Sequence, residues 1–202
     1  MSKRGLLVIF SGPSGSGKGT VLQSLLTERP DVAVSISATT RQPRPGEQDG
    51  VHYFFRQREE FEQMIREDQL LEYAEYSGNY YGTPLSFIEQ QRQQGRHVVL
   101  EIEVQGALQV MQRCPDAVSI FLAPPSLAVL EERLRGRGTE TEEVILRRLG
   151  EAHRDLASMD KYQYIVVNRE VAQAAADVDH ILCAEAMRSD RMQEFKEEFL
   201  QC

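Results

Sequence analysis

Short apolar runs alternate with segments of helical periodicity along most of this sequence. Residues 6–10 form a continuous apolar run, which is typical of a strand buried on both faces of a sheet. Residues 20–28 follow with apolar side chains at helical spacing. The same patterns predict strands at 33–36, 97–102, 118–122 and 164–167, and helices at 59–67, 84–94, 104–112, 126–135 and 141–159. Alternating strands and helices predict an α/β fold with a parallel sheet core flanked by helices.

Two stretches interrupt this alternation. Residues 41–81 contain closely spaced prolines and glycines, a short aromatic strand at 53–55 and a turn signal at 77–79. We expect them to form a small strand-rich insertion at the ligand edge of the sheet. Gly-Arg-Gly at 136–138 separates two predicted helices, and we expect it to belong to a mobile helical lid. A terminal helix with a solvated acidic face is expected at 184–200.

Composition and charge exclude several classes of protein. The 202 residues suffice for one substantial core, and the net charge of −8 argues against duplex DNA or an anionic membrane as the main partner. No apolar run approaches the ~20 residues that cross a bilayer, and the N-terminus lacks the apolar core of a secretory signal. We therefore expect a cytoplasmic location. Cys114, Cys183 and Cys202 lie far apart without metal-ligand spacing, which predicts reduced thiols.

A phosphate-binding motif follows the first predicted strand. Residues 12–18, G-P-S-G-S-G-K, fit the pattern G-x-x-x-x-G-K between a buried strand and a helix, which is the context that the motif requires. Its backbone N–H groups and Lys18 are expected to hold the phosphates of a nucleotide. The alternative is a glycine-rich turn with a surface lysine. The residues expected to bind the nucleotide here are Gly12, Pro13, Ser14, Gly15, Ser16, Gly17, Lys18, Gly19 and Thr20.

The metal ligands are less well defined, because Gly19 stands where serine or threonine usually places a hydroxyl on magnesium. Two interpretations stay open: Thr20 supplies that hydroxyl, or water and phosphate oxygens mainly hold the metal. Glu101 and Glu103 end a predicted strand on one face, at the carboxyl edge where a parallel sheet binds ligands. Glu101 is a candidate for a water-mediated magnesium contact. Both acids could instead cap the helix that follows.

Two arginines suggest a site for a second phosphate. Arg41 and Arg44 are three residues apart in a proline-restricted segment. An extended polyproline-like chain turns once every ~3 residues, so both side chains would project to the same side. Two guanidinium groups on one side suit a phosphate monoester. A solvated basic loop is the alternative.

Three stretches together resemble the guanylate kinases: T-T-R-x-P-R-x-G-E at 39–47, S-G-N-Y-Y-G at 77–82 and G-R-G-T-E-T-E at 136–142. The resemblance extends over nearly the whole chain. It implies transfer of a phosphoryl group from ATP, with Mg²⁺, to GMP or dGMP in purine nucleotide metabolism. It also implies a core of residues 1–36, 97–126 and 160–202, a GMP-binding region at 37–96 and a lid at 127–159, in one domain spanning about 5–185.

The resemblance further implies which residues bind GMP. Its phosphate would be held by Arg41, Arg44, Tyr53 and Tyr81, and its guanine by Ser37, Glu72 and Thr83. The chemistry of guanine agrees, because its N1–H and 2-amino groups need a carboxylate and its O6 needs a donor such as a hydroxyl. Thr83 with Pro84 also fits a helix N-cap, and both roles can coexist. Family members more often have aspartate at the position of Glu103, whose contact with guanine, ribose or hydrated magnesium stays open.

The predicted lid supplies further cations. Along the helix at 141–159, which Thr139 and Glu142 could open as a capping box, Arg148 lies roughly 50° from the centre of the apolar stripe and Arg147 points nearly the opposite way. Arg148 also matches the position of a catalytic arginine in the family. Arg137 is a second candidate, for the adenine or the γ-phosphate, and Arg133 is a weaker third with a surface role as the alternative.

Asn168 resembles the adenine contact of the family. The expected mechanism is direct in-line transfer without a general base, in which Lys18, Arg41, Arg137, Arg148 and magnesium offset the repulsion between two polyanions. Two other functions remain open: a non-catalytic guanylate-kinase-like module that binds phosphorylated peptides, and a kinase of another small phosphate. No nucleic acid or membrane partner is expected, and both a monomer and a homodimer fit.

Overall fold

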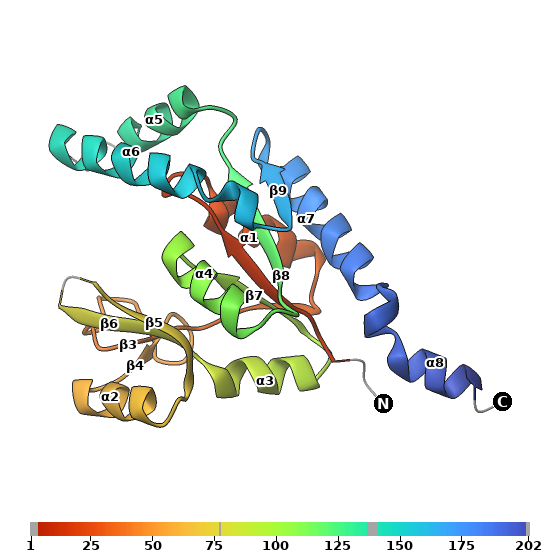
Figure 1. Cartoon of the computed structure of the whole chain (residues 1–202). Coiled ribbons are helices and arrows are strands. Elements are labelled where there is room, and N and C mark those ends of the chain that lie inside the picture. Colours follow the sequence, from red (N-terminus) through yellow and green to blue (C-terminus); the bar gives the residue numbers. More distant parts are fainter. Residues whose placement is uncertain (1–3, 77, 137–140, 201–202) are drawn as a thin grey trace.

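The computed structural model describes residues 4–76, 78–136 and 141–200 (Figure 1). A five-stranded sheet in the order β2-β7-β1-β8-β9 forms its centre. All its neighbouring strands run parallel, which confirms the predicted α/β fold. The strands are β1 (Leu7–Ser11), β2 (Val32–Val34), β7 (His97–Glu101), β8 (Val118–Ala123) and β9 (Tyr164–Val167).

Helices cover both faces of this sheet because its central strands carry buried apolar residues on both sides. Val8 and Phe10 belong to a core cluster with α1 (Lys18–Glu28) and α7 (Val171–Ala186). Leu7 and Ile9 belong instead to a cluster with α3 (Leu85–Gln93) and α4 (Val104–Arg113). The continuous apolar run of β1 is therefore explained by burial on two faces.

The interruption after residue 40 folds into a second sheet, as predicted. Its order is β4-β3-β6-β5, formed by β3 (Ala38–Thr39), β4 (Phe54–Phe55), β5 (Leu70–Tyr76) and β6 (Asn79–Pro84). Helix α2 (Arg58–Arg66) packs on it through Phe61, which contacts a small core with Ala38 and Leu70. The second sheet therefore has a small hydrophobic core of its own, separate from the core of the main sheet.

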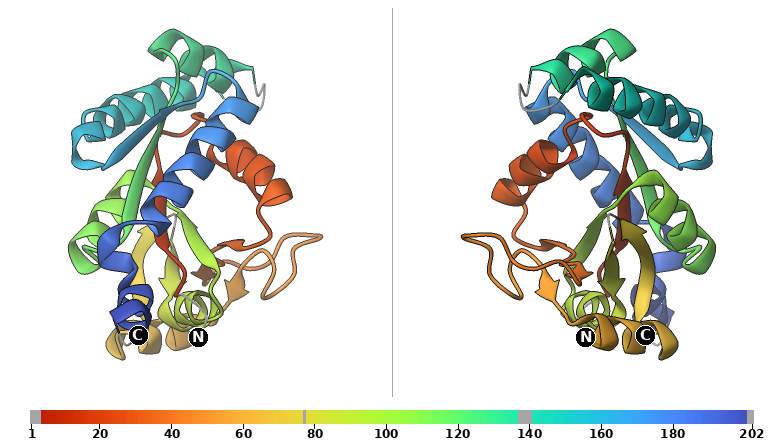
Figure 2. Two further views of the ribbon diagram at one scale, coloured as in Figure 1. Left: turned by 90° about the vertical axis from the view of Figure 1, so that its right-hand side faces the viewer. Right: turned by 90° about the vertical axis from the view of Figure 1, so that its left-hand side faces the viewer.

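Helices α5 (Leu127–Arg135) and α6 (Glu142–Leu156) form a third layer, which we call the lid helices. They share a small core of Leu130, Leu134, Ile145 and Ala152. In Figures 1 and 2 they lie across the top of the molecule, while the small sheet and α2 lie toward the bottom. Thr141, the N-cap of α6, makes no side-chain cap bond, and Thr139 of the expected capping box lies outside the described residues.

The C-terminal region differs from the sequence-based expectation. The single helix expected at 184–200 is wrong: its first residues end the long helix α7, and a 3-10 turn at Ser189–Arg191 separates α7 from α8 (Gln193–Leu200). The helix is interrupted at Arg188, where the backbone is extended, with a ψ of 139°. A second 3-10 turn, Met159–Lys161, precedes β9. Within the described ranges, none of the helices is long and apolar enough to cross a membrane.

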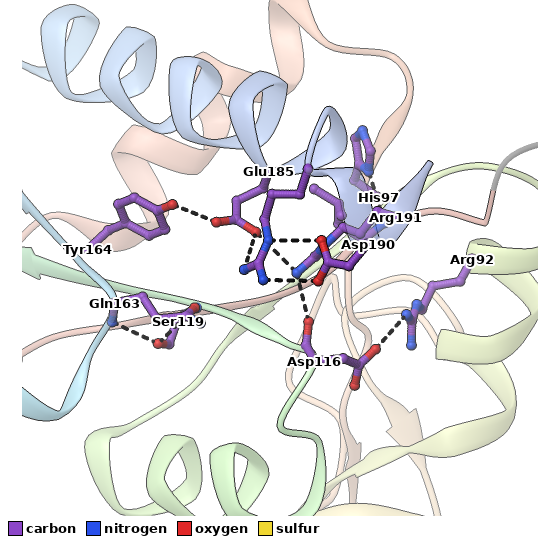
Figure 3. A network of polar contacts seen from close by, with 11 residues as sticks. Arg92, His97, Asp116, Ser119, Gln163, Tyr164, Glu185, Asp190 and Arg191 are labelled. Atoms are coloured by element: carbon purple, nitrogen blue, oxygen red, sulfur yellow. Dashed lines mark hydrogen bonds and ion pairs between the residues drawn. The ribbon is translucent and has the colours of Figure 1, made fainter. Parts of the chain in front are cut away.

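A buried carboxylate anchors this C-terminal region, as Figure 3 shows. Glu185 accepts a hydrogen bond of 2.5 Å from the hydroxyl of Tyr164 and forms an ion pair with Arg191 at 3.1 Å. Arg191 also donates to the carbonyl of Asp116 at 3.0 Å. Tyr164 begins β9 and Asp116 precedes β8, so the network joins the end of α7 to the amino ends of two core strands.

Candidate active site

The predicted phosphate loop lies between β1 and α1. Gly12 has a φ of +147° and leaves no room for a side chain, since a Cβ there would lie 2.3 Å from the carbonyl oxygen of Leu122. Gly17 has a φ of +93°, in the left-handed region, and begins α1 as its N-cap. The Nζ of Lys18 donates to the carbonyl of Gly12 at 2.6 Å. The loop thus has the shape and the cation that a polyphosphate site requires.

Asn168, just after the edge strand β9, and Arg133, on α5, support this loop. The Nδ2 of Asn168 donates to the carbonyl of Ser16 at 2.8 Å, and Arg133 donates to the same carbonyl at 3.3 Å and to that of Asn168 at 3.0 Å. Asn168 is only 2% exposed. Arg133 is therefore not a purely surface residue. This supporting role could not be predicted from the sequence, because nothing in the spacing links residue 168 to residue 16.

Glu101, the last residue of β7, faces the start of α1. Glu101 lies beside the phosphate loop, with Oε1 3.7 Å from the position that a Cβ on Gly19 would take. Burial raises the pKa of Glu101, the charge of Lys18 opposes that shift, and Glu103 adds to it. Glu103 is the N-cap of α4 but makes no side-chain cap bond, so the capping alternative is wrong for its side chain.

Among the described residues, no cluster of three or more histidine, cysteine or acidic side chains could hold a metal by itself. Glu101 and the exposed Thr20 are nevertheless hard oxygen donors near the loop. Mg²⁺ binds through one or two such groups together with water and substrate phosphates, so these residues fit that ion.

The aromatic and cationic residues predicted to bind the second phosphate gather on the small sheet. The guanidinium carbon of Arg41 lies 5.4 Å from the ring centre of Tyr53, and the rings of Tyr53 and Tyr81 are 6.2 Å apart. The side chain of Arg41 is 16% exposed and donates to Glu47. Arg44 differs: its side chain is exposed, and it joins this cluster through its main-chain N–H, which donates to Glu47 at 2.7 Å.

A carboxylate and a hydroxyl meet directly at the predicted base site. Thr83 is fully buried, and its Oγ1 donates to the Oε1 of Glu72 at 2.6 Å. Burial raises the pKa of Glu72, and the bond from Thr83 opposes that shift. The N-cap interpretation of Thr83 is wrong, because Thr83 belongs to β6 and Pro84 is the N-cap of α3. Ser37 lies partly buried just before β3.

The lid helices contribute the predicted arginine. Arg148 is partly buried, and its Nη1 donates to the hydroxyl of Ser14 in the phosphate loop at 3.4 Å. The side chain of Arg147 is 62% exposed and pairs with Glu151 on the outer face of α6. The predicted orientations of the two arginines are therefore confirmed. Arg137 lies outside the described residues.

Two acids near the site were not identified from the sequence. Asp155 on α6 is close enough to Glu103 and Lys18 to feel both charges: burial raises its pKa most, Glu103 adds to the shift and Lys18 opposes it. Glu47 lies within one of the stretches that carry the resemblance, but no role was assigned to it. Glu47 follows no periodic pattern, whereas Asp155 lies about two helical turns after Arg148 on the same face of α6, a spacing that points to it.

Comparisons with known proteins show similarity over nearly the whole chain. The family model described as "Guanylate kinase" matches residues 4–185. The guanylate kinase of Desulfitobacterium hafniense (strain Y51) is 57% identical over 187 residues, which cover 93% of this chain and 94% of that protein. The guanylate kinase of Streptococcus thermophilus (strain CNRZ 1066) is 56% identical over 193 residues, which cover 95% and 92%. The crystal structure of guanylate kinase from Anaplasma phagocytophilum matches with a TM-score of 0.74 and 33% identity, over 94% of this chain and 90% of that one.

Proposed function

The chain belongs to the guanylate kinase family, and from that premise we propose how its own residues transfer the terminal phosphoryl group of ATP to GMP. The products are ADP and GDP, and we include dGMP as an acceptor. Residues 1–36, 97–126 and 160–202 form the core that binds ATP, residues 37–96 bind the acceptor, and residues 127–159 form the lid. Family membership supports a cytoplasmic location.

The phosphate loop binds ATP. Its backbone N–H groups and the start of α1 receive the phosphate oxygens, and Lys18 exchanges its bond with the Gly12 carbonyl for the β- and γ-phosphates. Asn168 contacts the adenine. Its Oδ1 supports this role, because it is buried without a hydrogen-bond partner in the described part of the chain and can accept from an amino group.

The small sheet binds the phosphate of GMP. Arg41 provides the main charge, with Tyr53 and Tyr81 as hydroxyl donors beside it, and Arg44 adds a second cation from the loop. Tyr53 and Tyr81 belong to different segments of the small sheet region, so the site is assembled only when these segments pair. A phosphate held by planar guanidinium groups is fixed in orientation as well as in position.

The bond between Thr83 and Glu72 is the single observation that carries the choice of acceptor. Glu72 can accept from the N1–H and 2-amino groups of guanine, and the hydroxyl of Thr83, which now donates its single proton to Glu72, can turn that proton to O6 when guanine binds. Adenine presents the opposite pattern at that edge, so a buried polar group would lose its partner at a cost of about 1–3 kcal/mol. Ser37 and Glu103 complete the proposed nucleoside contacts.

The transfer itself depends on charge rather than on a general base, because the phosphate of GMP is already ionised near neutral pH. Lys18, Arg41 and Arg148 offset the repulsion between the two nucleotides and stabilise the transferring group. Arg137 is proposed to assist from the lid, on the resemblance alone. Mg²⁺, held through Glu101, Thr20, water and the phosphates, would neutralise further charge on ATP. Closure of the lid helices excludes water, which would otherwise accept the phosphoryl group.

A coupled assay of ATP consumption with GMP, dGMP, AMP, UMP, CMP and a panel of phosphorylated sugars tests this proposal. We expect turnover with GMP and dGMP, loss of turnover after chelation of Mg²⁺, and little with the other acceptors. A non-catalytic module would consume no ATP with any of them. A kinase of another small phosphate would prefer a different acceptor, and either result would refute the assignment.

A further inference from the structure

Glu47 holds the guanidinium of Arg41 with both of its carboxylate oxygens. Oε1 and Oε2 accept from Nη2 of Arg41 at 2.8 and 3.0 Å. Both side chains are mostly buried, at 16% and 18% exposure. This pairing lowers the pKa of the Glu47 carboxyl and raises that of the Arg41 guanidinium, so both groups are charged at neutral pH. The pair therefore lies ionised where the acceptor phosphate is proposed to bind.

Glu47 also shapes the loop that carries Arg44. Its Oε2 accepts from the main-chain N–H of Arg44 at 2.7 Å, and its own N–H donates to the carbonyl of Arg44 at 3.0 Å. One carboxylate thus closes a turn and at the same time fixes an arginine six residues before it. An exposed ion pair formed by chance would not also organise the backbone between its two partners.

The remaining contacts confine Arg41 while leaving it able to bind a ligand. Its guanidinium carbon lies 5.4 Å from the ring centre of Tyr53 and 5.9 Å from that of Phe55, and Nη1 donates to the carbonyl of Gln42 at 2.7 Å. A guanidinium has five N–H donors. The bonds to Glu47, Gln42 and Tyr81 engage at most four of them, so at least one can donate to a phosphate oxygen.

We propose that Glu47 is a positioning residue for the acceptor phosphate: it holds Arg41 and the turn at residues 44–47 in the conformation that receives GMP before GMP arrives. This inference rests on the proposed role of Arg41 in binding that phosphate. Ordering a long side chain in advance removes an entropic cost from binding. Glu47 also brings a negative charge near an incoming anion, but the charge of Arg41, which pairs with it, offsets that repulsion.

Steady-state kinetics of Glu47→Ala and Glu47→Gln test the inference. For Glu47→Ala we expect KM for GMP to rise about fivefold to tenfold, while KM for ATP and kcat at saturating GMP stay within about twofold. Glu47→Gln keeps an oxygen acceptor of the same shape but loses the charge, so its KM for GMP should rise less, by at least about twofold. A KM for GMP that is unchanged or lower in both variants would overturn the proposal, and a lower value would identify Glu47 as a competitor of the phosphate.

Three further variants separate this inference from the proposed function. Glu62→Ala, which removes an exposed carboxylate paired with Arg58 on α2, is the matched control and should leave KM for GMP unchanged. If Arg41→Ala leaves KM for GMP unchanged, the proposed function of Arg41 fails. If Arg41→Ala raises it and the Glu47 variants do not, only the role of Glu47 fails.

The double variant Arg41→Ala/Glu47→Ala should bind GMP no worse than Arg41→Ala, because Glu47 acts through Arg41. Additive losses would contradict that route. Thermal unfolding of each variant gives its stability, and the assays are run well below the lowest midpoint. Should Glu47→Ala not fold, Glu47→Gln decides alone: a raised KM for GMP at unchanged KM for ATP supports the proposal, and no change overturns it.

Discussion

The guanidinium of Arg148 lies 3.4 Å from the hydroxyl of Ser14, which joins lid helix α6 to the phosphate loop. The contact spans 134 positions of the sequence and brings a cation from the lid to the place where the γ-phosphate of ATP is proposed to lie. Arg147, one residue earlier, points to solvent from the same helix. The two neighbours therefore offer a paired test of whether charge at this point, rather than helix stability, drives the reaction.

We expect Arg148→Ala to lower kcat by about 10²–10³-fold or more, because a positioned cation stabilises the charge of the transferring group. Arg148→Lys should recover only part of this loss, since an ammonium lacks the planar set of donors. The matched variant Arg147→Ala should keep kcat within about twofold. Initial rates at saturating ATP and GMP give the comparison, and near-normal turnover in Arg148→Ala would remove this residue from catalysis.

Glu72→Ala should weaken GMP binding selectively. Hydrogen bonds to a charged group contribute about 1.5–3 kcal/mol, so KM for GMP should rise by roughly 10-fold to 100-fold while KM for ATP stays the same. Burial raises the pKa of Glu72, so GMP binding should also weaken at a higher pH than it would with an ordinary glutamate. Steady-state rates give the two KM values, and titration calorimetry with GMP from pH 8 to pH 5 gives the pH dependence of binding. An unchanged GMP affinity in the variant would exclude Glu72 from the base site.

Asn168→Ala tests two roles of one side chain. Loss of the 2.8 Å bond to the Ser16 carbonyl should weaken every ligand of the phosphate loop, whereas loss of an adenine contact should weaken ATP alone. We expect Kd for ATP to rise about tenfold. Calorimetry with ATP and with inorganic tripolyphosphate, which has no adenine, separates the two roles. Equal losses for both ligands would leave loop support as the whole role of Asn168, and no loss for either would exclude both.

The phosphate loop, the sheet and the lid arginine could be predicted from the sequence because each depends on local spacing. Helix α7 could not, because its buried face includes small alanines and the charged Glu185, so its apolar stripe is weak. Thr83 was ambiguous for a different reason. Thr-Pro resembles a helix start, but pairing of Pro84 with Leu70 extends β6 to that proline. The bond between Glu47 and Arg41 depends on a loop conformation that no periodic pattern specifies.

Acid should weaken the fold through Asp31. The hydrogen bond from Arg29 lowers the pKa of this carboxyl from 3.8 to about 2, although burial opposes the shift. A pKa lowered by folding adds stability that is fully present above pH 3.8 and is lost as pH falls toward 2. Because the Asp31 side chain is 46% exposed, the contribution should be modest.

Urea unfolding between pH 6 and pH 2 gives the measurement for Asp31. Asp31→Asn should be less stable than the parent at pH 6 and should lose less stability below pH 4. The matched variant Asp160→Asn, which changes an exposed aspartate, should follow the parent at every pH. A parent and an Asp31→Asn variant with parallel pH curves would show that this pair does not contribute.

Glu185→Ala should destabilise the fold without changing catalysis. Its side chain is 4% exposed and bonds Tyr164 and Arg191 at the amino ends of the strands, whereas the phosphate loop follows the carboxyl end of β1. Removing the carboxylate leaves buried donors without their acceptor, so the free energy of unfolding should fall by about 1–3 kcal/mol. For a chain of this size the midpoint of thermal unfolding should fall by roughly 2–4 °C per kcal/mol.

The matched control is Glu170→Ala. It changes an exposed glutamate at the start of the same helix that makes no side-chain cap bond, and it should unfold like the parent. KM for both substrates and kcat at 25 °C should match the parent in both variants, and a change in KM for ATP or GMP in Glu185→Ala would show that the two ends of the sheet are coupled.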